Sequence, residues 1–302
     1  MSAYPNPLVS IITLNYNGTD TTCRFLESTR LLTHKNFEIL VCDMNSTHDP
    51  SALINKGNYP ATTVLRSHEN LGFAGGNNWG MRQAKGEFFF IVNNDTEVTA
   101  DLLEKLLAPF FSDPQIAVVC PKIKYYHNPE YIQYAGFAKM NMFTGRTSTI
   151  GDKQKDDGRF DAPGYTFGAH GCAMMVKREV AEKTGMFPEK FFLYYEEWDW
   201  SMRIRNAGYK IFYEPSAVIY HKESMSVGKE SLLKEYYLSR NRILFMRRNC
   251  SGFQWIVFLL FYSCFTFPKT VFTYTFSGNF KRLKTYLKAV GWNFTHSKNS
   301  TV

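Results

Sequence analysis

Polar side chains that can bind a ligand follow three short apolar runs in this sequence. A buried strand that ends in amides or a carboxylate delivers such groups to the edge where open α/β sheets bind their ligands. The clusters are Asn15 after residues 8–14, Asp43 after residues 37–42, and Asn93, Asn94 and Asp95 after the run that ends at Val92. An Asx-rich turn that only caps a strand has the same composition, so one cluster alone leaves the function open.

A second set of carboxylates, Glu196, Glu197 and Asp199, lies among aromatic residues. They stand at the start of a helix that we expect to end near Asn206, where acidic residues commonly complement the helix dipole. The same helix amides can keep a carboxylate ionised inside an aromatic pocket, as a general base requires. An expected strand farther along ends in His221, and by itself such a histidine favours a structural role.

The order of strands and helices decides how these clusters meet. Five expected strands alternate with helices over about 120 residues, which is typical of an α/β fold with a doubly wound, mostly parallel sheet. Residues 62–66 form the third strand and residues 116–120 the fifth. Because parallel strands bring their carboxyl ends to one edge, Asn15, Asp43 and Asp95 should share a ligand-binding edge.

A glycine-rich segment, residues 70–77, follows the third strand. We expect a loop here whose backbone N–H groups approach a ligand, followed by a helix over residues 77–84. The segment matches neither of the two common phosphate-binding motifs, so its spacing does not decide its role. Periodicity is lost between residues 122 and 165, where a mobile loop is the simplest expectation.

The composition is that of a globular protein with an anionic partner. With 44% hydrophobic and 21% charged residues, disorder is excluded as an overall description. A net charge of +8 indicates nucleic acid, a phosphate-bearing substrate or an anionic membrane surface. Aromatic residues crowd the carboxyl-terminal part, which favours a membrane over nucleic acid. Six cysteines without paired spacing indicate reduced core thiols and a reducing cytosol.

Two segments near the carboxyl terminus predict membrane contact. Residues 253–267 are almost wholly apolar up to Pro268, shorter than the roughly 20 residues that span a bilayer, which favours a re-entrant or interfacial segment. Behind it, apolar and basic residues occupy opposite faces of an expected helix that would lie on an anionic membrane. The apolar set is Phe280, Leu283, Leu287 and Val290, and the basic set is Lys281, Arg282, Lys284 and Lys288. Packing of the tail or a homo-oligomer interface is the alternative.

In this order the clusters resemble family 2 glycosyltransferases of the GT-A fold, and within them the rhamnosyltransferase-like group. The resemblance covers about residues 6–250 and includes the Tyr195-Glu196-Glu197-Trp198-Asp199 segment through His221. It implies a GT-A domain followed by a helical, membrane-associating extension. The implied parts are a domain at residues 1–228, its nucleotide-sugar-binding half at 6–121, its acceptor-binding and catalytic half at 122–228, and the extension at 229–302.

The resemblance implies an inverting, metal-dependent transfer of a sugar from a nucleoside diphosphate to a hydroxyl of a glycan or lipid-linked acceptor, in cell-surface polysaccharide or lipopolysaccharide synthesis. It favours dTDP-L-rhamnose as donor, with a UDP-sugar as the alternative, and it places the protein peripherally or monotopically on the cytoplasmic face of the cell membrane. Two other classes compete. A nucleotidyltransferase would need a basic glycine-rich signature at the first strand, whereas a non-catalytic membrane scaffold would carry a decayed transferase domain.

The same resemblance implies roles for single residues. Asp43 would hydrogen-bond the nucleobase beside Asn15, and Glu197 would be the general base. Glu197 stands where the family usually has Asp, which leaves Glu196 and Asp199 as alternative bases. The residues implied for the ribose and diphosphate are Asn70, Gly72, Gly76, Asn77, Asn94 and Asp95, and those implied for a Mg²⁺ or Mn²⁺ ion are Asp95, Asn93 and His221.

Overall fold

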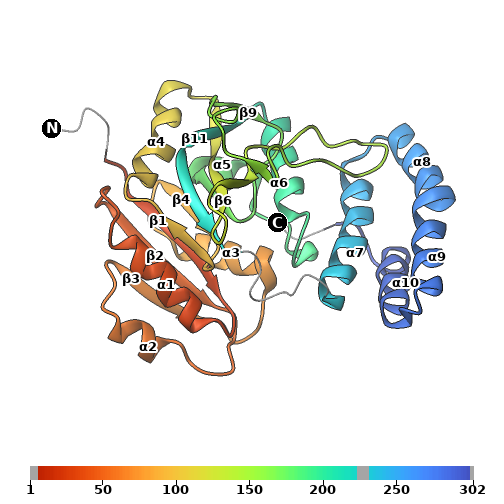
Figure 1. The fold of residues 1–302 in the computed structure, drawn as a ribbon, viewed down its shortest axis with the longest axis horizontal. Coiled ribbons are helices and arrows are strands. Elements are labelled where there is room, and N and C mark those ends of the chain that lie inside the picture. Colours follow the sequence, from red (N-terminus) through yellow and green to blue (C-terminus); the bar gives the residue numbers. More distant parts are fainter. Residues whose placement is uncertain (1–5, 223–230, 300–302) are drawn as a thin grey trace.

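The computed structural model describes residues 6–222 and 231–299. A large α/β unit lies on one side and helices α7 to α10 lie on the other (Figure 1). The expected domain boundary at residues 228 and 229 lies outside the described residues. Helix α7, Leu232–Asn249, packs on helix α6, Glu196–Asn206, and on the short 3₁₀ turn η1, Glu189–Phe191. The carboxyl-terminal helices are therefore joined to the α/β unit through α7.

One mixed sheet forms the centre of the α/β unit, in the order β3-β2-β1-β4-β10-β6-β11-β5. The strands are β1 Val9–Asn15, β2 Phe37–Asp43, β3 Thr62–Arg66, β4 Phe88–Val92, β5 Thr96–Val98, β6 Ile116–Tyr125, β7 Tyr131–Tyr134, β8 Gln154–Lys155, β9 Gly164–Thr166, β10 Ala173–Lys177 and β11 Lys210–His221. The first four in this order are parallel, as the sequence predicts. Strand β10 starts at their carboxyl edge and runs antiparallel to β4 and β6, so the sheet is mixed beyond β4.

Besides α6, which ends at Asn206 as expected, the described residues of the α/β unit form five α-helices. Four of them are α1 Thr19–Thr29, α2 Ser51–Lys56, α4 Leu102–Ser112 and α5 Arg178–Thr184. Helix α3 spans Gly72–Gln83 and therefore begins inside the segment predicted to be a loop. Its glycines permit close packing on the sheet, because a Cβ at Gly76 would lie 2.7 Å from Sδ of Met44 and one at Gly80 would lie 2.6 Å from Cγ2 of Ile12.

The segment between residues 122 and 165 is ordered, contrary to the expected mobile loop. Strands β7 and β8 form a hairpin against the end of β6, and β9 pairs with β11. Lys122 is buried and donates to Asp156, at 2.8 Å, and to Asp161. These ion pairs hold the segment, and sequence periodicity could not reveal them because their partners lie more than thirty residues apart.

The apolar carboxyl-terminal segment is one continuous helical rod, so the prediction that it stops at Pro268 is wrong. Helix α8, Gly252–Phe261, passes through a π-helical turn at Tyr262–Thr266 into α9, Phe267–Phe276. Pro268 lacks an N–H, and its ring crowds the carbonyl four residues earlier. The π-helical turn before it is wider than an α-helical turn and accommodates both the missing hydrogen bond and the ring. The rod, Gly252–Phe276, has 25 residues and is long and apolar enough to cross a membrane.

Helix α10, Phe280–Thr295, packs on α7, so its apolar side is only partly available to a membrane. Tyr286, Ala289 and Val290 are buried, whereas Phe280 and Leu287 are exposed. The alternative of tail packing thus holds for one side of this helix.

Candidate active site

Asn15, Asp43 and Asn94 lie at one edge of the sheet and are joined by hydrogen bonds through Thr22 of α1. The parallel register of β1 and β2 sets Asn15 opposite Asp43, and Nδ2 of Asn15 donates to Oδ1 of Asp43 at 2.7 Å. The Thr22 hydroxyl donates to Oδ1 of Asn15 at 2.8 Å and accepts from Nδ2 of Asn94 at 2.8 Å. The predicted shared edge is therefore present as a continuous polar network.

Asp43 is wholly buried and its carboxylate is saturated by protein donors. Oδ1 also accepts from Oγ of Ser46 at 2.5 Å, Oδ2 accepts from the Ser46 N–H at 3.1 Å, and Nε of Arg66 lies 3.5 Å from Oδ2. A carboxylate offers about four lone-pair positions. In this arrangement Asp43 organises the loop after β2, and its contact with a nucleobase stays a prediction.

Asp95 and His221 come together because β5 and β11 are paired antiparallel, with Thr96 opposite His221. Nε2 of His221 lies 3.1 Å from Oδ1 of Asp95. That carboxylate oxygen is buried and accepts no well-formed hydrogen bond from residues 6–222 and 231–299. Nδ1 of His221 lies 2.7 Å from Oε1 of Gln133, which can only accept, so Nδ1 carries a proton and Nε2 is the atom aimed at Asp95.

This pair fits a divalent cation. Neighbouring ligands of an octahedral ion at about 2.1 Å lie about 3 Å apart, which matches the separation of the two atoms. Burial opposes charge on His221, but the Cys172 sulfur and the Asp95 carboxylate outweigh it and raise the pKa of His221 to about 11, so a cation that binds here must displace the proton on Nε2. Asn93 lies at the same strand end and is half-buried. Among the described residues no three His, Cys, Asp or Glu side chains are arranged as a metal site, so these side chains would supply only two ligands to a cation.

Glu196 and Glu197 stand in the first turn of α6, where Glu196 is buried and Glu197 is half-buried. Oε2 of each is buried and lacks a hydrogen-bond partner among the described residues. Burial raises the pKa of Glu197 to about 7, although backbone N–H groups partly offset it. Burial and the neighbouring charge of Glu197 raise the pKa of Glu196 well above its ordinary range. The pair therefore places an acid whose pKa is raised beside a carboxyl group whose pKa lies near 7, where it can take up a proton.

The backbone before this pair is strained. Phe192, Tyr194 and Tyr195 all have positive φ, at 65°, 69° and 73°. Each such non-glycine residue costs on the order of 1–3 kcal/mol, and strain of this kind clusters at functional sites. The segment formed by residues 190–195 is named the left-handed turn below.

Ring contacts extend from Trp198, one residue after Glu197, to His170. Trp198 packs on Phe137 with ring centroids 4.8 Å apart. Phe137 stacks on His170 at 5.6 Å. His170 is half-buried, and burial together with the charge of His221 lowers its pKa to about 3.

The sequence profile described as Glycosyl transferase family 2 matches residues 10–185, more than half of the chain. The chain belongs to glycosyl transferase family 2. The match includes Asn15, Asp43 and Asp95, whereas Glu196, Glu197 and His221 lie beyond it. The enzyme class expected from the sequence, a glycosyltransferase, is confirmed at the level of the family.

Relatives and solved structures agree with this assignment. The glycosyltransferase is 24% identical over 249 residues to an N-acetylglucosaminyl-diphospho-decaprenol L-rhamnosyltransferase of Mycobacterium tuberculosis, covering 74% of this chain and 78% of the relative. It is 36% identical over 88 residues to the UDP-Glc:alpha-D-GlcNAc-diphosphoundecaprenol beta-1,3-glucosyltransferase WfaP of Escherichia coli, covering 29% of this chain and 35% of the relative. The chain spans less than half of the length of the first curated relatives that it matches.

The fold is that of GT-A glycosyltransferases, as expected. The mannosyltransferase PcManGT of Pyrobaculum calidifontis, solved in complex with GDP-Man and Mn²⁺, superposes with a TM-score of 0.60 at 17% identity, over 98% of this chain and 77% of that one. At this identity the likeness shows the fold alone.

The glycine-rich segment of this glycosyltransferase lies differently from the prediction. The N–H groups of Phe73 and Ala74, in the first turn of α3, donate to the carbonyl of Phe192 at 2.7 and 3.3 Å. The positive φ of Gly72 and its contact with Phe192 leave no room for a side chain there. Asn70 accepts from the Gly72 N–H, and Asn77 is buried and donates to Phe73 O. These residues hold protein backbone in this arrangement.

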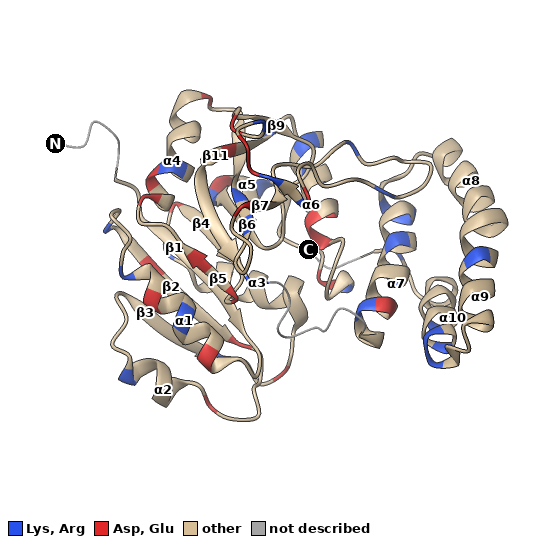
Figure 2. Ribbon diagram, in the orientation of Figure 1, with Lys and Arg blue, Asp and Glu red and all other residues tan. Residues whose placement is uncertain are grey.

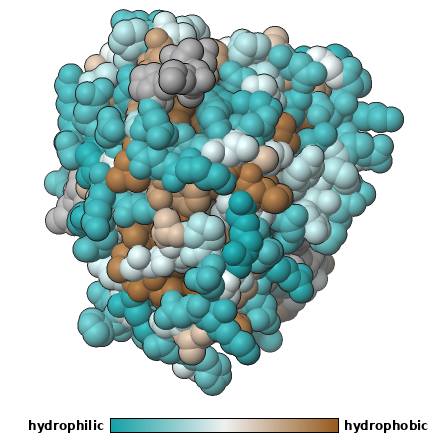
Figure 3. Space-filling model, turned by 90° about the vertical axis from the view of Figure 1, so that its left-hand side faces the viewer, coloured by the Kyte–Doolittle hydropathy of each residue, from teal (hydrophilic) through white to brown (hydrophobic). Residues whose placement is uncertain are grey.

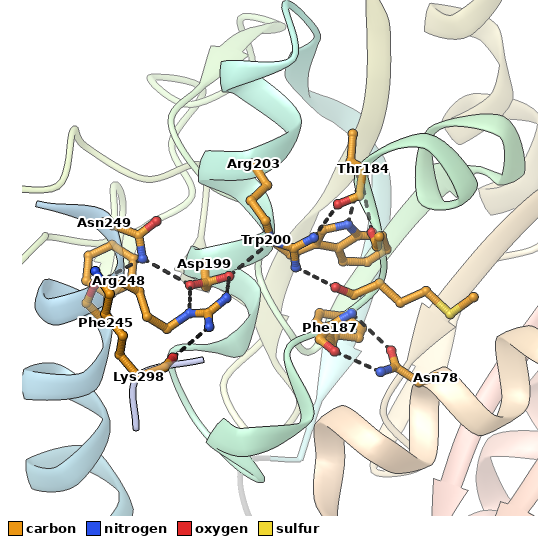
Figure 4. Close-up of polar contacts among 12 residues, drawn as sticks. Asn78, Thr184, Phe187, Asp199, Trp200, Arg203, Phe245, Arg248, Asn249 and Lys298 are labelled. Atoms are coloured by element: carbon orange, nitrogen blue, oxygen red, sulfur yellow. Dashed lines mark hydrogen bonds and ion pairs between the residues drawn. The ribbon is translucent and has the colours of Figure 1, made fainter. Parts of the chain in front are cut away.

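Asp199 is held in an ion-pair network between α6 and α7 (Figure 4). Its oxygens accept from Nε of Arg203 at 3.1 Å, from Nε of Arg248 at 2.6 Å and from Nδ2 of Asn249 at 3.0 Å. Arg203 also donates to the carbonyls of Thr184 and Met186. Both oxygens of Asp199 are therefore occupied by protein donors, whereas Oε2 of Glu197 has no partner among the described residues, which favours Glu197 over Asp199 as the base.

Sequence reasoning missed Thr22, Gln133 and Asn241, the side chains that hold the predicted ones in place. Thr22 lies one helical turn after Gly18, and Gln133 lies in a segment taken as a loop. In each case the sequence shows only a common polar residue, with no neighbouring motif that would indicate its role. The predicted reduced thiols are confirmed, since all six cysteines are free.

Proposed function

We propose that this chain catalyses inverting, metal-dependent transfer of a sugar from a nucleoside diphosphate to an acceptor hydroxyl. One observation carries the proposal. Oε2 of Glu197 is buried without a partner among the described residues, and the pKa of Glu197 is raised to about 7. A base with a pKa near the working pH is the most effective at taking a proton from an attacking hydroxyl.

Glu197 takes the proton of the acceptor hydroxyl. At the same time the acceptor oxygen forms a bond to the anomeric carbon of the sugar, and the bond from that carbon to the diphosphate breaks. Attack from the face opposite the leaving group inverts the configuration. Burial and the Glu197 charge raise the pKa of Glu196, which disfavours a second negative charge next to the base.

Asp95 and His221 would hold a Mg²⁺ or Mn²⁺ ion, and Asn93 remains a proposed contributor. Such an ion, when bound, neutralises the charge that develops on the departing diphosphate. Gln133 keeps the His221 tautomer in which Nε2 faces Asp95. Asn15, Asp43 and Asn94 shape the donor side, with Asp43 acting on the loop around Ser46. The first N–H groups of α3 donate to a carbonyl of the left-handed turn in this arrangement. A direct role of Gly72, Gly76 or Asn77 on the diphosphate is therefore not part of the proposal.

The proposed donor is dTDP-L-rhamnose and the proposed acceptor is a lipid-linked glycan. The support is the similarity to the Mycobacterium tuberculosis rhamnosyltransferase along most of both chains. A UDP-sugar is the second candidate, supported by the shorter match to WfaP. Hydrolysis measured across dTDP-, UDP- and GDP-sugars, each with and without Mn²⁺, tests both. Turnover of one donor with Mn²⁺ only is expected, and a donor turned over equally in EDTA would contradict the metal-dependent mechanism.

Isothermal titration with the matching nucleoside diphosphate separates an enzyme from a scaffold. Binding that strengthens with Mn²⁺ is expected from the Asp95–His221 pair. Absence of metal-dependent binding in the folded protein would favour a non-catalytic membrane scaffold.

We also propose that the protein lies on an anionic membrane through the α8–α9 rod and α10. The support is exposure and charge together. Phe253, Phe265, Phe272 and Phe276 are each at least 61% exposed, which is unusual for phenylalanine at a water-facing surface. In Figure 2, α8 and α9 are almost without charge, whereas α10 carries basic residues. The opposite end of the molecule, seen in Figure 3, is mostly hydrophilic with small apolar patches.

Flotation with vesicles of phosphatidylglycerol and of phosphatidylcholine tests the membrane proposal. Binding to the anionic vesicles is expected, and Phe272→Ser with Phe276→Ser should release the protein. Leu31→Ser is the control, because Leu31 is 65% exposed and lies just after α1, far along the chain from the rod. Unchanged flotation of the double variant would contradict the proposal. Contact with the cytoplasmic leaflet is part of the same proposal.

A further inference from the structure

We propose that Asn241 and Arg240 of α7 are positioning residues, which hold the left-handed turn and thereby aim the carboxylate of Glu197. The inference rests on the proposed role of Glu197 as general base. Asn241 is fully buried and Arg240 is nearly so, although both lie in the region that the sequence assigns to membrane association.

Five consecutive carbonyls of the left-handed turn accept hydrogen bonds from other elements. Nη2 of Arg240 donates to Lys190 O at 2.8 Å and to Phe191 O at 2.6 Å. Nδ2 of Asn241 lies within hydrogen-bond distance of three carbonyls, those of Phe191 at 2.9 Å, Leu193 at 2.7 Å and Tyr194 at 2.8 Å. The fifth carbonyl, Phe192 O, accepts from the first turn of α3.

This arrangement explains how the turn keeps its conformation. Positive φ at non-glycine residues persists only when surrounding contacts determine it. A buried carbonyl without a donor is costly, so the turn is held in the one conformation in which all five are satisfied. Ring contacts add to this, since Phe192 stacks on Tyr237 at 5.1 Å and Tyr195 lies 5.8 Å from Phe245. Tyr195 directly precedes Glu196, so the conformation of the turn sets the direction of the first turn of α6.

Helix α10 packs on the side of α7 away from the turn. Nδ2 of Asn293 donates to the backbone carbonyl of Arg240 at 3.0 Å, and the Arg240 guanidinium lies 4.6 Å from the ring centroid of Trp292. Nε of Arg240 also donates to Oδ1 of Asn241 at 2.7 Å, which directs the Asn241 amide nitrogen toward the turn. The Asn293 hydrogen bond thus reaches only the α7 backbone, and the donors to the turn are the side chains of Arg240 and Asn241.

Asn241→Asp is the test variant, because it keeps the size of the side chain and replaces the donating amide with an acceptor. A displacement of about 1 Å can reduce the rate about 100-fold, so kcat should fall by about that factor while the donor KM changes little. The pH profile of kcat should also move, since the surroundings of Glu197 change. Hydrogen–deuterium exchange of residues 190–197 should rise.

Asn293→Asp is the matched control, because it makes the same change at a buried site against α7 without touching the turn. It should lower Tm to a comparable extent and leave kcat, the pH profile and the exchange of residues 190–197 near wild type. Equal loss of kcat in both variants, or an Asn241→Asp protein with wild-type kcat and exchange, would overturn the inference. If Glu197→Gln retains turnover, the proposed base is wrong instead, and the exchange experiment still decides whether Asn241 holds the turn.

Discussion

The two sides of the site differ in how their polar groups are satisfied. On the donor side, Asn15, Asp43 and Thr22 bond to one another, and the carboxylate of Asp43 is saturated. On the acid side, Glu196 and Glu197 each keep a buried oxygen without a partner among the described residues. The first side is preformed by its own hydrogen bonds, while the second keeps reactive groups in place through remote helices. Changes on the donor side should therefore affect binding, and changes on the acid side should affect rate.

The largest effect is expected from Glu197→Gln. Removal of a general base costs about 10²–10⁴-fold in rate, and donor affinity measured by titration should stay within a few-fold of wild type. Glu196→Gln is the matched control, because it makes the same change at the neighbouring acid in the first turn of α6. Turnover of Glu197→Gln within a few-fold of wild type, or an equal loss in both variants, would show that the base lies elsewhere.

Asp95→Asn tests the proposed metal site, which belongs to neither of the two sides compared above. The amide removes the charge that faces Nε2 of His221, so the gain in nucleoside diphosphate affinity on adding Mn²⁺ should be lost. Gln133→Leu should weaken the same gain by about 10- to 100-fold, because residues that orient a metal-binding histidine carry effects of that size. Titration in Mn²⁺ and in EDTA measures both. Metal-dependent binding that survives in Asp95→Asn would remove Asp95 from the proposed metal site.

The pH profile should report the raised pKa of Glu197. Its folded-state pKa of about 7 lies above the ordinary value, so the base is protonated and inactive below pH 7 and becomes active as pH rises through 7. One unit below that pKa, kcat should be about tenfold under its plateau. The same shift makes folding less favourable as pH rises from the ordinary glutamate pKa toward 7, because the unfolded chain gives up the proton first. A rate plateau that extends to pH 5 would contradict the assignment.

The difference between the two sides also decides what the sequence could predict. Asn15, Asp43 and the Asn93-Asn94-Asp95 cluster each follow an apolar strand, and parallel pairing brings such ends together, so local pattern predicted the edge at which Asn15, Asp43 and Asn94 meet. The composition of the acid cluster was enough to predict a candidate site, but it could not predict the backbone conformation that positions these acids. The left-handed turn depends on Asn241, about fifty residues later, and on α3, more than a hundred residues earlier. The glycines of residues 72–76 were assigned to a ligand because spacing cannot tell a phosphate from a protein carbonyl.

The smallest effect is expected at Thr22, and it tests whether the donor side is held by its internal network. Thr22→Val keeps the shape of the side chain but leaves Oδ1 of Asn15 and Nδ2 of Asn94 without the hydroxyl between them. Loss of a buried partner costs about 1–3 kcal/mol, so Tm should fall and the donor KM should rise a few-fold with kcat little changed.

Thr29→Val is the matched control for Thr22→Val, since Thr29 is equally buried on α1 and donates only to Leu26 O, a carbonyl of its own helix. It should cost less stability and leave the donor KM unchanged. If Thr22→Val lowers kcat and spares KM, the two sides are not separable, and the acidic pair depends on the donor network as well as on α3 and α7.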